Sequence, residues 1–440
     1  MKPRSPSKNK AVPETNKGGS EKLWQFARGM GMTRRRFLLL LSAGGMAAVL
    51  AYCTGLPLPT ATAPTADEST EEGPQFSKDP APFIDLGGGN LEARLESMQG
   101  LITPSRFFFV RNNSVSLEVD AADWRLFIEG DAVSHRLELS YDDILNLPSR
   151  TFVSYLECAG NQRAMFDLVK GREAKGTQWK TGAVGNGVWT GAAMRDVLER
   201  AGITEEAVSV LLIGLDTDSP EKGFRRVMPV EKAMDPDTLL AYALNGEALP
   251  RDHGFPLRAL APGWVGAANI KWLGRIVVSS KQLWTRNNTT SYAMIGDSYP
   301  PVGESLGKPL TTQTVKSALA LVWPADLGAG EHRIYGFAHS PNGPIAKVEW
   351  SIDSGATWNA STLEEPQIQA EFGQLAEDFS DSAFRYSWTR FGFTWDARRG
   401  EHTIMTRATD AAGNTQPDEI PFNEKGYLFN QPLPHPIRVT

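Results

Sequence analysis

Apolar positions between residues 83 and 312 are spaced in ways that predict both strands and helices. Residues 208–215 are almost continuously apolar, which is typical of an interior strand. Residues 191–201 carry apolar side chains at helical spacing, at Met194, Val197, Leu198 and Ala201, and predict a helix. Further predicted elements are strands at 124–129 and 151–157 and a short helix at 141–147 entered from Ser140. This mixed order predicts an α+β domain without the regular alternation of a doubly wound sheet.

After about residue 313 the pattern changes to short strand-like runs separated by turn sequences. The runs are 334–338, 348–352, 391–395 and 403–408. The turns include Pro341-Asn342-Gly343, Asp353-Ser354-Gly355 and Ala412-Gly413-Asn414. This alternation predicts an antiparallel β-sandwich over 313–440, which is Ig-like in architecture only because it lacks the paired cysteines of antibody domains.

The N-terminal segment has the composition of an export signal followed by a linker. Its first 36 residues hold ten Lys and Arg against two Glu, a net charge of +8. The twin-arginine sequence Thr33-Arg34-Arg35-Arg36-Phe37-Leu38 leads into an uncharged run over 37–52 and then Ala61-Thr62-Ala63. These features predict a twin-arginine signal over 1–55, a Pro/Thr/Glu-rich linker over 56–82 and a periplasmic or other extracytoplasmic location. A membrane span needs about 20 apolar residues, and the uncharged run over 37–52 is shorter than that. An uncleaved N-terminal membrane anchor and lipidation at Cys53 remain alternatives.

The charge of the remaining chain and the cysteine count exclude several classes of protein. The whole chain has a net charge of −6, so the residues after the basic head carry −14, which argues against nucleic-acid binding. Two cysteines, Cys53 and Cys158, are too few for a disulfide scaffold or for a cysteine-held zinc or iron–sulfur cluster. No GxGxxG motif follows a predicted strand and no P-loop sequence is present, so dinucleotide and triphosphate binding lack motif support.

Cys158 lies in the stretch with the most specific chemistry, Tyr155-Leu156-Glu157-Cys158-Ala159-Gly160-Asn161-Gln162-Arg163. A lone thiol after a β-rich run is often a small buried core residue. Arg163 allows a second interpretation, because positive charge lowers the pKa of a nearby thiol and favours the thiolate, which is a soft metal ligand. The residues by themselves leave both interpretations open.

Residues 156–163 resemble the cysteine signature of the sulfite oxidase family of molybdopterin-dependent oxidoreductases. Other segments resemble the same family in the same order, at 107–112, 214–216, 235–236, 244–246, 249–258, 262–266, 270–275 and 414–417. The resemblance extends from about residue 85 to 440. It implies a molybdopterin-binding catalytic domain of sulfite oxidase type over 83–312 and an Ig-like dimerisation domain over 313–440, and hence a homodimer.

The resemblance also implies roles for individual residues. The Cys158 thiolate would be the protein's ligand to molybdenum, which decides between the two interpretations of this cysteine. Arg111, Arg163, Tyr292 and, with a looser match, Arg390 would form a small anion pocket above the metal. The phosphate of the pterin needs cations and N–H donors. The matching cofactor-binding residues are Phe109, Val110, Arg111, Asn112, Asn113, Asp216, His253, Arg258, Asn269, Ile270 and Lys271.

The chemistry that the resemblance implies is oxygen-atom transfer by molybdenum–molybdopterin, with sulfite or a related sulfur oxyanion as substrate. Because the sequence has no CxxCH motif and no haem-binding domain, we expect no haem and an external electron acceptor such as a cytochrome. Asn113 stands where many sulfite-oxidising members have histidine, which leaves reduction of a sulfoxide or another oxo-substrate as an alternative. A non-enzymatic exported binding protein that lost the metal is a third alternative, against which Cys158, Arg258 and Lys271 argue.

Overall fold

The computed structural model of the chain describes residues 76–440 except 380 and 381. The predicted twin-arginine signal over 1–55, Cys53 and most of the predicted linker over 56–82 therefore lie outside the described residues. Within the described ranges, no helix has the length and apolarity needed to cross a membrane.

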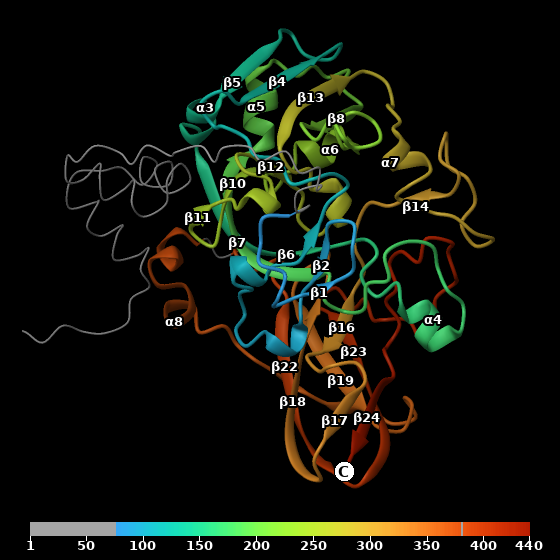
Figure 1. Cartoon of the computed structure of the whole chain (residues 1–440). Helices are drawn as coiled ribbons and strands as arrows, with labels where there is room; N and C mark the ends of the chain where they lie inside the picture. The colour runs from blue at the N-terminus through green and yellow to red at the C-terminus, as the bar shows by residue number, and fades with distance from the viewer. Residues whose placement is uncertain (1–75, 380–381) are drawn as a thin grey trace, which may run out of the picture. The chain divides into compact units, whose positions relative to one another are not determined.

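Two five-stranded sheets form the framework of the N-terminal part of the described chain (Figure 1). The first has the order β11-β10-β7-β6, with β12 also paired to β10. Its strands are β6 (Ser149–Glu157), β7 (Val184–Ala193), β10 (Leu239–Leu244), β11 (Glu247–Ala248) and β12 (Arg258–Leu260). The second has the order β5-β4-β13-β8-β9, with β4 (Arg125–Gly130), β5 (Leu137–Ser140), β8 (Ser209–Gly214), β9 (Arg225–Pro229) and β13 (Leu273–Ser279). Only the β4–β13 pair in these two sheets is parallel, so the predicted absence of a doubly wound parallel sheet is confirmed.

Shorter elements connect and flank these sheets. A small antiparallel sheet consists of β1 (Ile84–Asp85), β2 (Asn90–Glu92) and β3 (Val110–Arg111), and β14 (Ala293–Met294) pairs with β15 (Lys308–Pro309). The α-helices are α3 (Tyr141–Leu145), α4 (Met165–Lys170), α5 (Met194–Arg200), α6 (Val230–Ala233), α7 (Arg286–Thr289) and α8 (Ile368–Phe372). The 3-10 helices are η1 (Leu95–Ser97), η2 (Ser105–Phe107), η3 (Arg251–His253), η4 (Gly266–Ala268) and η5 (Gly373–Asp378).

Most elements expected in the first part of the chain are present. The strands predicted at 124–129, 151–157 and 208–215 correspond to β4, β6 and β8, and β8 lies between β13 and β9, as its continuous apolar sequence indicates. The helix predicted at 141–147 is α3. It begins with a capping box in which the Ser140 hydroxyl accepts from the Asp143 N–H and the Asp143 carboxylate accepts from the Ser140 N–H.

The prediction of a helix over 191–201 is wrong at its start, and α5 begins three residues later, at Met194. Gly191 belongs to β7, where it pairs with Ala241 of β10. A Cβ at Gly191 would lie 2.4 Å from the Leu240 carbonyl oxygen, so β7 and β10 approach each other closely at this position. Long-range pairing thus overrides the local helical spacing.

The C-terminal part of the chain forms two sheets that share one core, drawn in orange and red in Figure 1. One sheet has the order β16-β18-β22-β21, with β16 (Lys316–Leu319), β18 (Gly330–His339), β21 (Thr362–Leu363) and β22 (Thr389–Ala397). The other has the order β17-β24-β23-β19-β20, with β17 (Ala325–Leu327), β19 (Ile345–Ser351), β20 (Asn359–Ala360), β23 (Gly400–Asp410) and β24 (His435–Val439). The expected strands are present, but their pairing is not wholly antiparallel as predicted, because β17 pairs with β24 in parallel.

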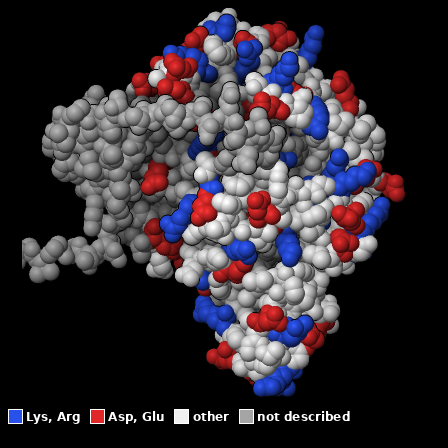
Figure 2. Space-filling model, viewed as in Figure 1, with Lys and Arg blue, Asp and Glu red and all other residues white. Residues whose placement is uncertain are grey.

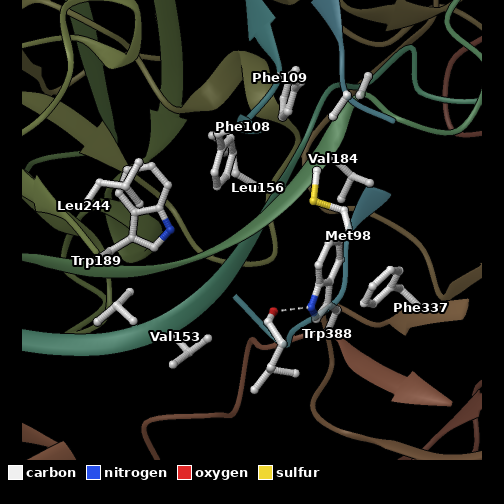
Figure 3. Packing of buried hydrophobic residues seen from close by; sticks show 14 of the residues in the cluster. Met98, Phe108, Phe109, Val153, Leu156, Val184, Trp189, Leu244, Phe337 and Trp388 are labelled. Atoms are coloured by element: carbon white, nitrogen blue, oxygen red, sulfur yellow. Dashed lines mark hydrogen bonds between the residues drawn. The ribbon is translucent and has the colours of Figure 1, made fainter. Parts of the chain in front are cut away.

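A large hydrophobic cluster joins the two parts of the chain. Trp388, which immediately precedes β22, stacks on Phe337 of β18 at a centroid distance of 4.1 Å. Its indole Nε1 donates to the Leu101 carbonyl at 2.6 Å, the hydrogen bond drawn in Figure 3. The same cluster contains Val153 of β6 and Met98. The sheet that leads to Cys158 is therefore packed directly on the C-terminal sheets.

Candidate functional site

Cys158 begins a tight turn at the end of β6, and its side chain is half-buried. Its N–H donates to the Ala183 carbonyl at 2.9 Å, and the Asn161 N–H donates to the Cys158 carbonyl at 2.9 Å. Gly266 packs on this turn, because a Cβ there would lie 2.8 Å from the Glu157 carbonyl oxygen and 3.3 Å from the Cys158 Cα. Any larger residue at 266 would displace the cysteine, so this close approach requires glycine.

One pocket brings together most of the residues predicted from the sequence. Those that line it are Phe109, Arg111, Asn112, Asn113, Cys158, Asp216, His253, Arg258, Asn269, Ile270, Lys271 and Tyr292. Val110, Arg163 and Arg390 do not line it. Val110 is buried in β3, where it supports the neighbouring pocket residues without reaching the surface of the pocket.

Arg258, the first residue of β12, places a buried positive charge in the pocket wall. Its side chain is 3% exposed and donates from Nη1 to the His253 carbonyl at 3.1 Å and from Nη2 to the Asn269 carbonyl at 2.9 Å. Among the described residues, its Nε has no hydrogen-bond partner. Burial lowers the pKa of Arg258 to about 9, and no described carboxylate offsets this cost. A buried guanidinium of this kind requires an anion to compensate it, and a phosphate fits its forked geometry.

His253 lies beside Arg258 and is also buried. Burial is the main cause that lowers the pKa of His253 well below 6.5, with Lys78, Arg258 and Lys271 adding to it, so the ring is neutral near pH 7. Its Nε2 is without a hydrogen-bond partner within the described part of the chain. Gly254, at φ +100°, turns the chain sharply after η3 and lets Lys271 pack against it, since a Cβ there would lie 2.8 Å from the Lys271 Cβ.

Lys271 supplies a second cation to the pocket. Its Nζ donates to the Asn112 side-chain oxygen and, at 2.9 Å, to the Asp252 carbonyl. Burial and then the charge of Arg258 lower the pKa of Lys271 well below its ordinary value, while Asp252 and Asp216 act in the opposite direction. An anionic group in the pocket would relieve the repulsion between these two cations.

Asp252 fastens the N-terminal end of the described chain to the pocket. Its fully buried carboxylate accepts from the N–H of Ser77 at 2.8 Å and from the N–H of Lys78 at 2.9 Å. Lys78 in turn donates from Nζ to the Phe108 carbonyl at 2.7 Å, and burial lowers its pKa to about 7. Residues 76–82 belong to the predicted solvated linker, but Lys78 packs against the domain because the buried Asp252 needs donors.

The remaining predicted pocket residues shape the walls. Arg111 at the end of β3 donates from Nη2 to the Asn113 side-chain oxygen at 2.8 Å, so these two residues act as one polar unit. Asp216 accepts from the Phe224 N–H at 2.8 Å, and burial raises its pKa. Asn269 donates to the Val265 carbonyl at 3.0 Å, which orders the loop before Ile270 and Lys271.

Tyr292 enters the pocket beside a cluster of aromatic residues. Its ring lies 5.8 Å from Phe224 and stacks on Tyr427 of the C-terminal part, with centroids 5.7 Å apart. The fully buried Arg226 lies 5.9 Å from the Tyr292 ring and donates to two backbone carbonyls. Burial raises the pKa of Tyr427 far above 10, and its hydroxyl donates to the Ser291 carbonyl at 2.7 Å. The C-terminal part therefore helps to orient Tyr292.

Arg163 does not line the pocket, and its hydrogen bonds stabilise the turn that follows Cys158. Its Nε donates to the Lys425 carbonyl at 2.6 Å and its Nη1 to the Thr177 carbonyl at 2.7 Å. The guanidinium also lies 5.1 Å from the Tyr427 ring. A Cβ at Gly160 would lie 2.5 Å from Arg163 Nη2, so the glycine of the cysteine signature makes room for this arginine. In the structure, Arg163 ties the cysteine turn to the C-terminal segment.

Arg390 is the one predicted site residue that lies well away from the others. It is in β22, where its Nε forms an ion pair with Glu364 at 3.3 Å and its Nη1 donates to the Gln99 carbonyl at 2.7 Å. Its guanidinium covers the Tyr335 ring at 4.6 Å. The prediction of a third pocket arginine at 390 is therefore not supported, because the strand pairing of β22 fixes this side chain elsewhere.

Several pocket residues were not singled out from the sequence: Leu156, Phe224, Asp252, Gly266, Ala267 and Trp272. Asp252 and Gly266 lie inside segments that resemble the family, so those segments were the available signal. Nothing in the sequence marks Phe224, which reaches the pocket only because β8 and β9 pair.

The positive character of the site comes from its own side chains. On the face shown in Figure 2, Lys and Arg are interspersed with Asp and Glu. Among the described residues, no group of three or more His, Cys, Asp or Glu could hold a metal ion by itself. One thiol, two buried cations and unsatisfied donor groups fit a metal that is delivered with its own sulfur ligands and a phosphate.

Comparisons with known proteins agree with this chemistry. Residues 112–286 match the family model described as an oxidoreductase molybdopterin binding domain, and residues 310–437 match the model of a Mo-co oxidoreductase dimerisation domain. The chain is 34% identical over 345 residues to mitochondrial sulfite oxidase of Mus musculus, covering 76% of this chain and 60% of that protein. It is 32% identical over 345 residues to sulfite oxidase of Arabidopsis thaliana, covering 74% of this chain and 86% of that protein.

A solved structure supports the fold as well. The sulfane dehydrogenase SoxCD from Paracoccus pantotrophus matches with a TM-score of 0.67 and 27% identity, covering 80% of this chain and 86% of that chain. The chain thus spans about 60% of the length of the mouse relative and most of the other two. With the pocket geometry, these similarities lead to one conclusion: the chain belongs to the sulfite oxidase family of molybdopterin-dependent oxidoreductases.

Proposed function

We propose that the protein oxidises sulfite or a related sulfur oxyanion by oxygen-atom transfer and passes the electrons to an external acceptor such as a cytochrome. The observation that carries the proposal is the convergence of Cys158, Arg111 and Tyr292 on the pocket that also contains Arg258 and Lys271. In this proposal, a thiolate donor, an anion-binding arginine and a phosphate site thus line the same pocket.

In this proposal, each group of pocket residues has a separate role. Arg258 and Lys271 hold the phosphate of the pterin, and His253 adds a neutral ring nitrogen beside them. Cys158 gives the metal its thiolate from the protein. When bound, the molybdenum cofactor supplies the two-electron oxygen-atom transfer chemistry. Arg111 attracts the oxyanion and Tyr292 positions it.

Metal analysis combined with one substitution tests the proposal. Purified protein should contain molybdenum and should reduce cytochrome c when sulfite is added. Cys158→Ser should abolish turnover and leave the circular dichroism spectrum unchanged, because a hydroxyl has a much higher pKa and is a harder, poorer donor to molybdenum. Cys53→Ser is the matched control. Turnover like that of the parent in Cys158→Ser would refute Cys158 as the ligand.

The same assay also tests the direction of the reaction. The alternative, reduction of a sulfoxide or another oxo-substrate, rests on Asn113, which keeps hydrogen bonding without the titratable charge of a histidine. Sulfoxide-dependent oxidation of a reduced dye, without sulfite-dependent cytochrome reduction, would favour that alternative.

Assembly and location complete the proposal. We propose a homodimer formed through residues 313–440, supported by the match of that region to a dimerisation domain. A monomer at all concentrations in sedimentation experiments would contradict it. Export by the twin-arginine pathway rests on residues 1–55 alone, and replacement of Arg34 and Arg35 by lysine should retain the protein in the cytoplasm.

A further inference from the structure

A fully buried carboxylate lies immediately before Cys158. The Glu157 side chain is 0% exposed, and its Oε1 accepts from Lys316 Nζ at 2.8 Å and from Asn161 Nδ2 at 2.9 Å. Asn161 also accepts from the Ala183 N–H at 3.0 Å, the residue whose carbonyl binds the Cys158 N–H. The carboxylate therefore belongs to the same hydrogen-bonded turn as the cysteine.

Lys316 reaches Glu157 from the other part of the chain. It is the first residue of β16, its side chain is 2% exposed, and Glu157 is its hydrogen-bond partner. Lys316 is paired across the sheet with His339, whose Nε2 lies 3.6 Å from Glu157 Oε2. Burial lowers the pKa of His339 to about 4, so its ring is neutral near pH 7. Among residues 76–379 and 382–440, Lys316 is then the charged partner of the Glu157 carboxylate.

A second contact runs between the same two regions. Gln313 donates from Nε2 to the Glu157 backbone carbonyl at 2.9 Å. Gly266 contacts that carbonyl and the Cys158 Cα from another side. The backbone at 157 is thus held by the C-terminal part, by the turn and by the η4 loop, and it has little freedom to shift the cysteine.

We propose that Lys316 and Glu157 are positioning residues that fix the Cys158 sulfur in the pocket, so the C-terminal sheets set the geometry of the ligand in addition to mediating dimerisation. The inference rests on the proposed role of Cys158 as the molybdenum ligand. A buried ion pair contributes little to net stability compared with apolar residues of similar size, because desolvation cancels much of the attraction. We infer that the ion pair contributes structural specificity, since both charges are paired in only one arrangement of β6 against β16.

The experiment separates positioning from stability. Lys316→Met alone leaves a buried charge without a partner and should lower the melting temperature strongly. The double substitution Glu157→Gln with Lys316→Met removes both charges and keeps an amide oxygen for Asn161. All variants are made in the full-length chain with Cys53→Ser, so Cys158 is the single thiol. Lys347→Met, at an exposed lysine that forms an ion pair with the half-buried Glu349, is the matched control.

Two properties of Cys158 are then measured besides activity. One is the alkylation rate of the thiol in the full-length chain prepared without cofactor, and the other is the thiolate-to-molybdenum absorption and Mo(V) EPR spectrum of the loaded protein. We expect the double variant to melt within a few degrees of the parent, to be alkylated roughly tenfold faster and to show altered spectra, as for a coupled pair in contact. The Lys347→Met control should match the parent in every measurement.

The result that overturns the inference is a double variant that recovers both the melting temperature and the parent thiol reactivity and spectra. Failure of the proposed function looks different. In that case Cys158→Ser would leave the metal spectra unchanged, whereas failure of the positioning role leaves the spectra sensitive to Cys158→Ser and insensitive to the double substitution. If Lys316→Met does not fold, the double variant still gives the decisive comparison.

Discussion

Arg258 allows the sharpest quantitative prediction, because it is buried and no described carboxylate balances its charge. Replacing it with Met keeps the unbranched apolar stem of the side chain and removes the charged guanidinium. We expect the cofactor-free protein to keep or gain stability, while the retention of cofactor falls sharply. A stabilising arginine in an ordinary structural role would give the opposite result for the cofactor-free protein.

The magnitude follows from the pKa of Arg258, which burial lowers from above 12 to about 9. At 1.36 kcal/mol for each pH unit, the charge costs the folded protein about 5 kcal/mol near pH 7. The substitution also leaves the carbonyls of His253 and Asn269 without these donors, at about 1–3 kcal/mol each. The unfolding free energy of the cofactor-free variant should therefore change by between about −1 and +3 kcal/mol.

The pH dependence gives an independent check. The unfolded chain binds more protons than the folded chain between pH 9 and the unfolded pKa. The cost is therefore complete below pH 9, falls steadily as the pH rises above 9 and disappears only at the unfolded pKa. Urea unfolding at pH 7 and about pH 10.5 should thus show the variant losing part of its relative advantage at the higher pH. Arg438→Met, at an exposed arginine, is the control. A loss of more than about 3 kcal/mol at pH 7, independent of pH, would refute the reasoning.

Three further predictions concern the substrate and the cysteine turn. Arg111→Gln should raise the KM for sulfite about tenfold to a hundredfold with a smaller effect on kcat, because a charge-assisted hydrogen bond is lost; an unchanged KM in steady-state kinetics would contradict its role. Asn113→His should add a pH dependence of kcat/KM at about pH 6 to 7 and improve sulfite turnover. If the parent already oxidises sulfite rapidly and the variant has the same pH profile, the residue at 113 does not determine specificity. Gly266→Ala should destabilise the protein by about 1–3 kcal/mol and reduce its molybdenum content, since the new methyl group collides with the Glu157 carbonyl; a normal melting temperature and metal content would show that the turn can move.

Local sequence was sufficient where the structure depends on neighbouring residues. Residues 208–215 are almost continuously apolar and contain the interior strand β8, and Ser140 with Asp143 begins α3 through a capping box. The resemblance in residues 156–163 identified Cys158, and the segments around Arg258 and Lys271 supplied the two buried cations of the pocket. Burial of one strand and capping of one helix need few partners, so a short stretch specifies them.

Tertiary structure decided what depends on the meeting of distant segments. Gly191 joins β7 in place of a helix because β10 approaches it, and β17 pairs with β24 in parallel although the local pattern predicts an antiparallel sandwich. Arg390 matched the family only loosely and is held by Glu364 outside the pocket.

The charge balance around the site shows the same division most clearly. Sequence identified Arg258 as a cation, but only the fold shows that no described carboxylate accompanies it and that Glu157 is paired with Lys316, 159 positions away. The cost of a buried charge depends on which groups surround it in space, whereas residue spacing records only which groups are neighbours along the chain. The sequence by itself therefore determined which kinds of charged and metal-binding side chains this protein has, and the tertiary structure decided which of these side chains act together.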